Sequence, residues 1–260
     1  MKIVFVTQED PFYIRIFFET FFNNYKNLYE IQGLIICRTM GKSITKLIKQ
    51  MYGFYGPVDF FRIGLRYAKN KMLGALLGKI YFKTFFNIEH LCNYYKIKVI
   101  RCKNINDSEM IKRLNDMKVD VIVSVAAPQI FKEAILNVPK WGCINIHNAK
   151  LPKYRGMLPN FWAMYHNEKF SAITIHTMDQ EVDRGKFLLQ REFEINPHES
   201  LDMLIKRTKT LGALYLIEIL ENIKQGRVVF QEPEKTQTSY FSFPKSSDVK
   251  QFRSMGKRLL

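Results

Sequence analysis

Three polar side chains of the types needed for acid–base chemistry lie between Gly142 and Gly185. Asn145 and His147 are two positions apart at the end of an apolar run, and Asp183 closes an acidic turn after the next apolar run. Residues at i and i+2 of a strand project from the same face. An amide and an imidazole therefore point the same way, with a carboxylate returning beside them. Such a set can stabilise an oxyanion and move a proton.

The stretch resembles the signature of the folate-dependent formyltransferases. It reads Asn-Ile-His at 145–147, Leu-Pro-Lys-Tyr-Arg-Gly at 151–156 and Asp-Arg-Gly at 183–185. A looser resemblance extends from about Val119 to Gly226, whereas the first hundred residues match only in their opening strand. The family includes enzymes that formylate methionyl-tRNA, glycinamide ribonucleotide and amino sugars.

The resemblance implies transfer of a formyl group from 10-formyltetrahydrofolate to a primary amine, without a metal. Asn145 would donate its amide to the formyl oxygen, His147 would stabilise that oxygen or carry the proton, and Asp183 would orient His147. Acyl transfer of this kind needs no covalent enzyme intermediate, and the sequence has no Gly-x-Ser-x-Gly nucleophile elbow. His147 is preferred to His166 and His176 because only His147 has an asparagine at i−2.

The same resemblance implies where the folate lies. The positions that would line the pterin are Gln129, Ile130 and Phe131, with Asp179 in the facing turn. Main-chain groups of both segments would pair with the pterin edge, so side-chain identity there matters little. An ordinary strand-to-helix loop is the alternative interpretation of residues 129–131.

Two segments narrow the choice of acceptor amine. Residues 7–11 (Thr-Gln-Glu-Asp-Pro) follow the first strand with two acids and no glycine, which disfavours a phosphate cradle and the glycinamide ribonucleotide branch. The stretch after Gly226 is too short for the further β-barrel of the tRNA enzymes. We therefore expect a sugar N-formyltransferase of surface polysaccharide synthesis. A methionyl-tRNA formyltransferase and a non-catalytic folate-binding scaffold are the alternatives.

The expected substrate is an amino sugar linked to a nucleotide. Lys150, Tyr154 and Arg155 are the expected substrate-binding residues, because the 150–163 segment is similar to that of the sugar enzymes and two of them carry a positive charge. The aromatic segment 240–243 would either stack on a base or form a final edge strand. Nucleic acid is not an expected partner, and a homodimer stays open.

Composition agrees with a globular protein that meets an anionic partner. The 260 residues are 47% hydrophobic and include 40 Lys and Arg against 24 Asp and Glu, a net charge of +16. AT-rich codon usage is the alternative cause of the excess lysine. Four scattered cysteines, the absence of a signal-like N-terminus and of any apolar run near ~18 residues predict a cytoplasmic protein.

The order of strand and helix patterns along the sequence predicts an α/β fold, with a Rossmann-like, mostly parallel sheet flanked by helices that positions the site. A catalytic domain would span residues 1–226, and a small C-terminal extension, 227–260, would pack on it. Strands are expected at 2–7, 31–37, 98–101, 120–126, 142–147, 172–178 and 187–195. Helices are expected at 13–22, 108–117, 128–136, 157–167 and 200–225.

A basic amphipathic segment at about 41–95 is read as a helical insertion. Its helices are expected near 43–52, 58–76 and 80–95, with breaks at Gly53, Gly56 and Gly64. The favoured interpretation is an insertion whose apolar face closes a core. Peripheral membrane contact and a nucleic-acid surface are the alternatives.

Overall fold

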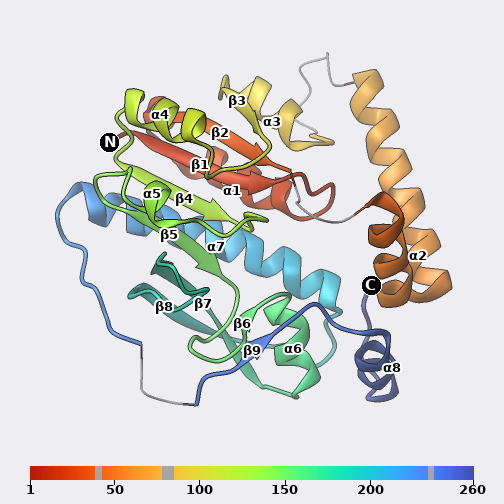
Figure 1. Ribbon diagram of the computed structural model, residues 1–260. Coiled ribbons are helices and arrows are strands. Elements are labelled where there is room, and N and C mark those ends of the chain that lie inside the picture. The colour runs from red at the N-terminus through yellow and green to blue at the C-terminus, as the bar shows by residue number, and fades with distance from the viewer. Residues whose placement is uncertain (39–42, 78–84, 234–236) are drawn as a thin grey trace.

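A mixed sheet of seven strands forms the centre of the protein (Figure 1). The computed structural model describes residues 1–38, 43–77, 85–233 and 237–260. The strands are β1 (Ile3–Gln8), β2 (Ile31–Cys37), β3 (Val99–Cys102), β4 (Val121–Val125), β5 (Cys143–His147), β7 (Phe170–Thr177) and β8 (Phe187–Glu194). They lie in the order β3-β2-β1-β4-β5-β7-β8. The first five are parallel, β7 runs antiparallel to β5, and β8 runs antiparallel to β7, which confirms the predicted α/β class.

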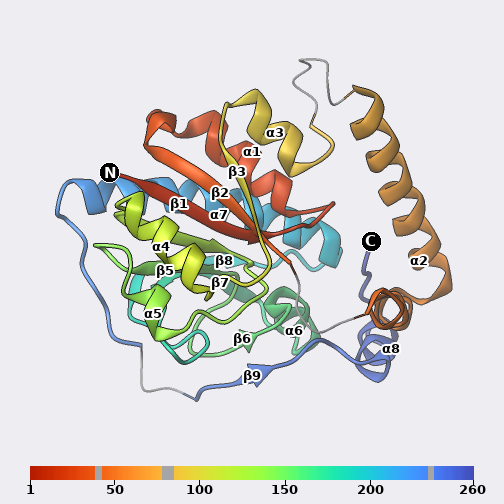
Figure 2. The same cartoon turned by 45° about the horizontal axis from the view of Figure 1, so that its top comes forward.

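Helices cover both faces of this sheet (Figure 2). The helices of the described residues are α1 (Ile14–Asn24), α2 (Ile44–Leu77), α3 (Ile88–Tyr94), α4 (Ser108–Asp116), α5 (Glu133–Leu136), α6 (Pro159–Tyr165), α7 (Leu201–Lys224) and α8 (Ser246–Ser254). One buried cluster joins the sheet to α1, α3 and α7, and a second joins the opposite face to α4 and α5. Each face of the sheet therefore has its own hydrophobic core.

Strand β1 shows how the sequence builds the two cores. Ile3 and Phe5 face the α1 and α7 side, whereas Val4 and Val6 face α4 and α5, and all four are fully buried. The ring of Phe5 packs edge-to-face on Phe18 of α1 at a centroid distance of 5.2 Å. Complete burial of such a side chain stabilises the fold by roughly 1.5–3 kcal/mol.

Helix α7 is the long helix expected at 200–225. The Ser200 hydroxyl accepts a hydrogen bond from the Met203 amide at its start, and Gly226 adopts φ 66° just beyond its end. Within the helix, Gly212 lets the backbone approach β5, since an added Cβ would lie 3.1 Å from Cγ2 of Ile146. This close approach fixes the depth of α7 against the strand that carries Asn145 and His147.

Within the described ranges, the chain after α7 contributes one short strand and one helix. Strand β9 (Tyr240–Phe241) pairs with β6 (Arg155–Gly156) in a small two-stranded sheet, so the expected edge strand exists but does not join the main sheet. Helix α8, which sequence patterning did not predict, buries Phe252 against Phe161 of α6 at a centroid distance of 4.7 Å. Phe54 of α2 belongs to the same cluster.

Three expected helices differ in extent from those observed. Helix α5 begins at Glu133, leaving residues 126–132 as an open loop, because the expected start at Pro128 lacks the run of backbone hydrogen bonds. Helix α3 begins at Ile88, where the Asn87 side chain accepts from the His90 amide at 2.7 Å; residues 78–84 of the expected helix lie outside the described residues. Helix α2 is broken at Gly56, as expected, where φ is 67° and Pro57 follows, but it continues through Gly53 and Gly64, where breaks were also expected.

Candidate active site

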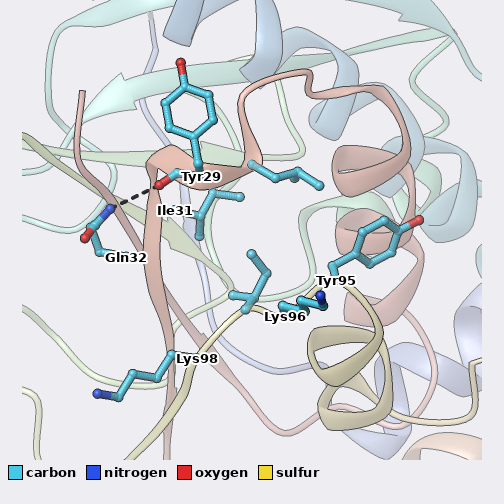
Figure 3. Close-up of a pocket in the computed structure, with 8 residues that line it drawn as sticks. Tyr29, Ile31, Gln32, Tyr95, Lys96 and Lys98 are labelled. Carbon is cyan, nitrogen blue, oxygen red and sulfur yellow. Dashed lines mark hydrogen bonds between the residues drawn. The ribbon is translucent and has the colours of Figure 1, made fainter.

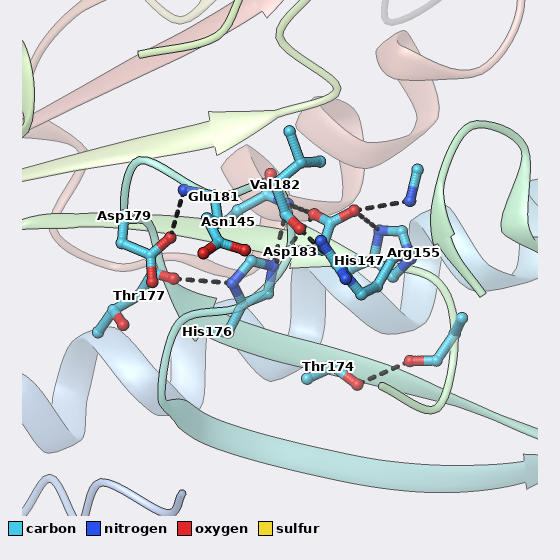
Figure 4. A network of polar contacts seen from close by, with 12 residues as sticks. Asn145, His147, Arg155, Thr174, His176, Thr177, Asp179, Glu181, Val182 and Asp183 are labelled. Carbon is cyan, nitrogen blue, oxygen red and sulfur yellow. Dashed lines mark hydrogen bonds and ion pairs between the residues drawn. The ribbon is translucent and has the colours of Figure 1, made fainter. Parts of the chain in front are cut away.

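The three predicted catalytic residues meet at the carboxyl end of β5 (Figure 4). Asn145 and His147 extend from β5, and Asp183 reaches them from the turn between β7 and β8. Antiparallel pairing of β5 with β7 aligns Asn145 with His176 and His147 with Thr174. The carboxyl edge of an open α/β sheet is where such folds bind their ligands.

The Asp183 carboxylate is held by donors on two sides. Its Oδ2 accepts from the Gly156 amide at 2.9 Å, and its Oδ1 accepts from Nδ2 of Asn145 at 3.4 Å. Burial alone would raise the pKa of this carboxyl, but His147, His176 and the Gly156 amide outweigh burial and hold the pKa well below its usual range. Asp183 is therefore ionised at neutral pH although its side chain is only 8% exposed.

His147 is oriented by the loop that follows β5. Its Nε2 lies 2.8 Å from the Tyr154 carbonyl oxygen, which can only accept, so Nε2 carries a proton. Its Nδ1 lies 3.6 Å from Oδ2 of Asp183. Burial lowers the pKa of His147, and the nearby carboxylate of Asp183 opposes that shift without cancelling it. At neutral pH Nδ1 is thus unprotonated, and its lone pair faces a carboxylate.

Asn145 is tied to a second histidine that the sequence interpretation set aside. Nδ1 of His176 lies 2.8 Å from the Thr177 carbonyl oxygen, which requires a proton on Nδ1 and leaves Nε2 to accept. Nδ2 of Asn145 donates to that Nε2 at 3.2 Å. His176 therefore fixes the orientation of the Asn145 amide. The signal for this role is the position of His176 opposite Asn145, and that position is visible only once β5 and β7 are paired.

Unusual backbone geometry surrounds these side chains. Tyr154 and Asp183 adopt φ values of 58° and 53°, in the left-handed region that residues with a Cβ enter rarely. A Cβ on Gly185 would lie 1.7 Å from the Thr177 carbonyl oxygen, and one on Gly156 would lie 2.3 Å from that of Phe241. The two glycines of the signature are therefore required by close backbone approach.

The expected folate-lining residues have distinct surroundings. Gln129 is engaged with the backbone: its Nε2 donates to the carbonyl oxygens of Arg38 and Lys103, at 2.8 and 2.7 Å, and its Oε1 accepts from the Ile105 amide. Phe131 is buried in the core beneath the loop, whereas Ile130 is 65% exposed. Of these three side chains, only that of Ile130 is available to a planar ring.

Asp179 shapes the facing turn. Its Oδ1 accepts from the Glu181 amide at 2.8 Å, and the residue itself is exposed. The carboxylate thus stabilises the turn that carries Asp183, in the manner of an Asx turn. The turn's main chain remains the part expected to meet a pterin edge.

The expected substrate-binding residues are largely engaged within the protein. Nζ of Lys150 pairs with Glu192 of β8 at 2.5 Å, with both side chains about half exposed. The Tyr154 hydroxyl donates to Glu168 at 2.7 Å. Nε of Arg155 donates to the Val182 carbonyl oxygen at 2.9 Å, and Arg155 is 9% exposed. Arg155 therefore braces the turn that carries Asp183, whereas Tyr154 ties the 151–156 loop to Glu168.

A lysine on α7 was not singled out from the sequence. Lys209 is partly buried, and burial lowers the pKa of its ammonium while Asp10 opposes that shift. Its charge also contributes to lowering the pKa of His147. Lys209 is thus a cation of α7 whose charge acts on His147. Regular helical spacing in α7 gave no signal that distinguished it from its neighbours.

A hollow of about 390 Å³ lies at the opposite edge of the sheet (Figure 3). It is lined by residues before and within β2 and before β3, including Tyr29, Gln32, Tyr95 and Lys98. Because these are the amino ends of parallel strands, the hollow is remote from His147 and Asp183. It takes no part in the catalytic cluster.

Comparison with known proteins shows the family to which the chain belongs. The formyl transferase family model covers residues 80–220, more than half of the chain. Methionyl-tRNA formyltransferase of Thermotoga neapolitana is 37% identical over 150 residues, which cover 58% of this chain and 48% of that relative. The chain spans about half the length of the curated relatives it matches.

Solved structures share the fold at low sequence identity. The N-formyltransferase from Helicobacter canadensis, in complex with folinic acid and dTDP-3-aminofucose, has a TM-score of 0.58 at 17% identity and covers 93% of this chain and 71% of that one. Glycinamide ribonucleotide transformylase 1 from Symbiobacterium toebii has a TM-score of 0.61 at 12% identity, with coverages of 90% and 94%. On the family match and the signature residues together, this chain belongs to the formyl transferase family.

Proposed function

We propose that this protein transfers a formyl group from 10-formyltetrahydrofolate to the primary amine of a nucleotide-linked amino sugar. The observation that carries the proposal is the cluster of Asn145, His147 and Asp183 at one strand end, with His147 neutral and Asp183 ionised. Family membership supports formyl transfer as the reaction class. The acceptor rests on narrower arguments, given below.

The residues present fit a formyl-folate donor. The cluster supplies one amide donor, from Asn145, and two acceptors, Nδ1 of His147 and the Asp183 carboxylate. The exposed Ile130 side chain offers an apolar contact for a planar ring on the neighbouring loop. Bound 10-formyltetrahydrofolate supplies an activated formyl carbon and a nitrogen leaving group.

His147 and Asp183 act on the attacking amine. An N–H placed between Nδ1 of His147 and Oδ2 of Asp183 satisfies two acceptors that otherwise face each other at 3.6 Å. His147 accepts the proton as the amine attacks, and the adjacent carboxylate stabilises the imidazolium that results. The imidazolium then gives this proton to the nitrogen that leaves as its bond to the formyl carbon breaks. The Tyr154 carbonyl oxygen keeps the ring aligned, because Nε2 stays bonded to it throughout.

Asn145 acts on the formyl oxygen. Both hydrogens of its amide are engaged in the free protein, with His176 at 3.2 Å and Asp183 at 3.4 Å. The contact with Asp183 is the longer and weaker of the two, so it is the one exchanged for the formyl oxygen. A preorganised donor of this kind typically lowers the barrier by about 3–4 kcal/mol.

The first βα loop argues against glycinamide ribonucleotide as the acceptor. Oδ1 of Asp10 accepts from the amides of Phe12, Tyr13 and Ile14, at 2.8, 2.6 and 3.3 Å. A carboxylate therefore occupies the amides at the start of α1. A substrate phosphate at that helix end would meet like charge in place of free N–H groups.

One structural likeness motivates the choice of an amino sugar. The likeness to the Helicobacter canadensis structure, which holds dTDP-3-aminofucose, extends over 93% of this chain. The similarity in sequence to methionyl-tRNA formyltransferases favours the second candidate, initiator tRNA.

Release of tetrahydrofolate from 10-formyltetrahydrofolate, followed by absorbance, tests the proposal. The acceptors would be nucleotide-linked amino sugars, the corresponding free sugars and charged initiator tRNA. We expect turnover with a nucleotide-linked amino sugar, abolished in His147→Ala. Turnover with tRNA alone would replace the sugar by the second candidate, and folate binding without turnover on any acceptor would contradict the enzymatic proposal.

A further inference from the structure

Helix α2 carries an apolar stripe on the face that points away from the protein. Val58, Phe61, Leu65, Met72 and Leu76 follow one another at intervals of three, four, seven and four residues, which places them on one side of a helix. Each is between 57% and 67% exposed. Scattered exposed apolar residues are ordinary, but an aligned row of five is typical of an interaction surface.

The opposite face of the same helix is anchored. Arg66 pairs with Asp202 of α7 at 3.0 Å, and Nδ2 of Asn70 donates to the Pro11 carbonyl oxygen at 3.4 Å. Asp59 pairs with Arg253 of α8 at 2.8 Å, and Ile63 is buried. Both Figures 1 and 2 place α2 at the periphery, outside α1 and α7. The expectation that the insertion closes a core therefore holds for one face only.

Positive charge flanks the stripe. Between residues 44 and 77 the sequence has six Lys and Arg and one acid, Asp59, which is turned toward Arg253. Arg62, Lys69 and Lys71 lie beside the stripe and are exposed. An exposed apolar row bordered by cations is the pattern of helices that lie in the interface of an anionic bilayer.

We propose that the outer face of α2 binds the surface of a membrane containing anionic lipid. The stripe enters the boundary between headgroups and acyl chains, and the flanking cations meet lipid phosphates. None of the helices in the described residues is long and apolar enough to cross a bilayer, so the helix lies along the surface. This contact is independent of the reaction proposed for the active site.

Charge argues against a second copy of the chain as the occupant. Two α2 helices paired through this stripe would bring Arg62, Lys69 and Lys71 of one copy against the same residues of the other. Like charges along the flanks of a helix pair oppose association. A bilayer rich in anionic headgroups satisfies the same cations.

Vesicle flotation with the full chain tests the proposal. The vesicles would be phosphatidylcholine alone, or phosphatidylcholine with phosphatidylglycerol. We expect wild-type protein to float with the anionic vesicles only, and the bound fraction to fall as salt is added. The stripe variant Phe61→Ser/Leu65→Ser should bind about tenfold more weakly, and so should Lys69→Gln/Lys71→Gln.

A matched control removes the same kinds of side chain elsewhere. Trp141→Ser/Lys140→Gln changes an exposed aromatic residue and a lysine before β5 and should bind as wild type does. Thermal unfolding would verify that every variant is folded. Equal binding to neutral vesicles, or unchanged binding by the stripe variant, would overturn the proposal. Failure of the wild-type protein to bind any vesicle would also overturn the proposal. A dimer in sedimentation velocity that the stripe variant abolishes would assign the face to a second copy of the chain.

Discussion

Nδ1 of His147 and Oδ2 of Asp183 lie 3.6 Å apart as two acceptors, because the proton of the imidazole is on Nε2 and engaged with Tyr154. Burial keeps His147 neutral, and the surrounding donors keep Asp183 ionised. The gap between the two atoms suits an N–H or O–H donor. The resting site is thus arranged to receive such a donor and not to hold a closed ion pair.

His147→Ala and Asp183→Asn should each lower kcat by about 10²–10³-fold or more, since the first removes the group that accepts the amine's proton and the second removes the negative charge that stabilises the imidazolium. Asparagine at 183 retains an acceptor for the Gly156 amide, so the fold should persist. Tetrahydrofolate release measures kcat, and circular dichroism measures folding. His198→Ala, on an exposed turn far from the cluster, is the matched control and should leave kcat unchanged. A wild-type rate in either catalytic variant would remove these residues from the mechanism.

His176→Phe should lower kcat by about 10–100-fold while the KM for the folate changes little. The replacement removes the acceptor that orients the Asn145 amide, although the ring is nearly fully buried and its volume is retained. His176→Gln offers an acceptor again and should recover part of the rate. If both variants lose the same activity, or if KM alone changes, His176 does not act through Asn145.

The pH profile should report the burial of His147. The neutral imidazole accepts the proton, and burial lowers its pKa below the ordinary value of 6.5. The value of kcat/KM should therefore be level near pH 7 and fall about tenfold per pH unit only below that depressed pKa. Lys209→Met removes a charge that also lowers this pKa, so the acidic limb should move to higher pH. A profile centred above 6.5 in the wild type would contradict the assignment.

Local patterns in the sequence predicted most strands of the sheet, because these strands are buried runs with clear boundaries. Strand β4 is β-branched at every position but Ser124, and α7 has a serine cap and a glycine stop. The proposed catalytic residues were identified through a signature, whereas the contact of His176 with Asn145 depends on the register between β5 and β7, which no local pattern encodes.

Long-range contacts account for what the sequence did not reveal. Helix α8 has little apolar sequence of its own and is held mainly through Phe252 and Val249 in a shared cluster. Gln129 looked like a loop residue beside a ligand, but its amide joins the ends of β2 and β3. Both roles depend on residues that are distant in the chain.

Gly185→Ala should destabilise the protein and abolish activity. An added Cβ would overlap the Thr177 carbonyl oxygen at 1.7 Å, and backbone cannot move aside as a flexible side chain can. The turn must shift, and Asp183 shifts with it. Denaturant unfolding and the formyl-transfer rate would measure the two effects. Gly64→Ala, where α2 leaves open space, should be neutral or stabilise by up to about 1 kcal/mol. A fully active Gly185→Ala protein would contradict the close approach of these strands.

Asp10→Ala should lower the free energy of unfolding by about 0.5–2 kcal/mol, because the carboxylate satisfies three amides at the start of α1. Asp10→Asn keeps an acceptor oxygen and should cost less. Glu9→Ala is the matched control. The Glu9 side chain is 76% exposed and its carboxylate lies 3.9 Å from Arg101, so its loss should change the free energy of unfolding by less than about 0.5 kcal/mol. Urea unfolding would rank the three variants. Equal effects of Asp10→Ala and Glu9→Ala would show that the start of α1 does not depend on this carboxylate, and would remove the argument that it excludes a substrate phosphate.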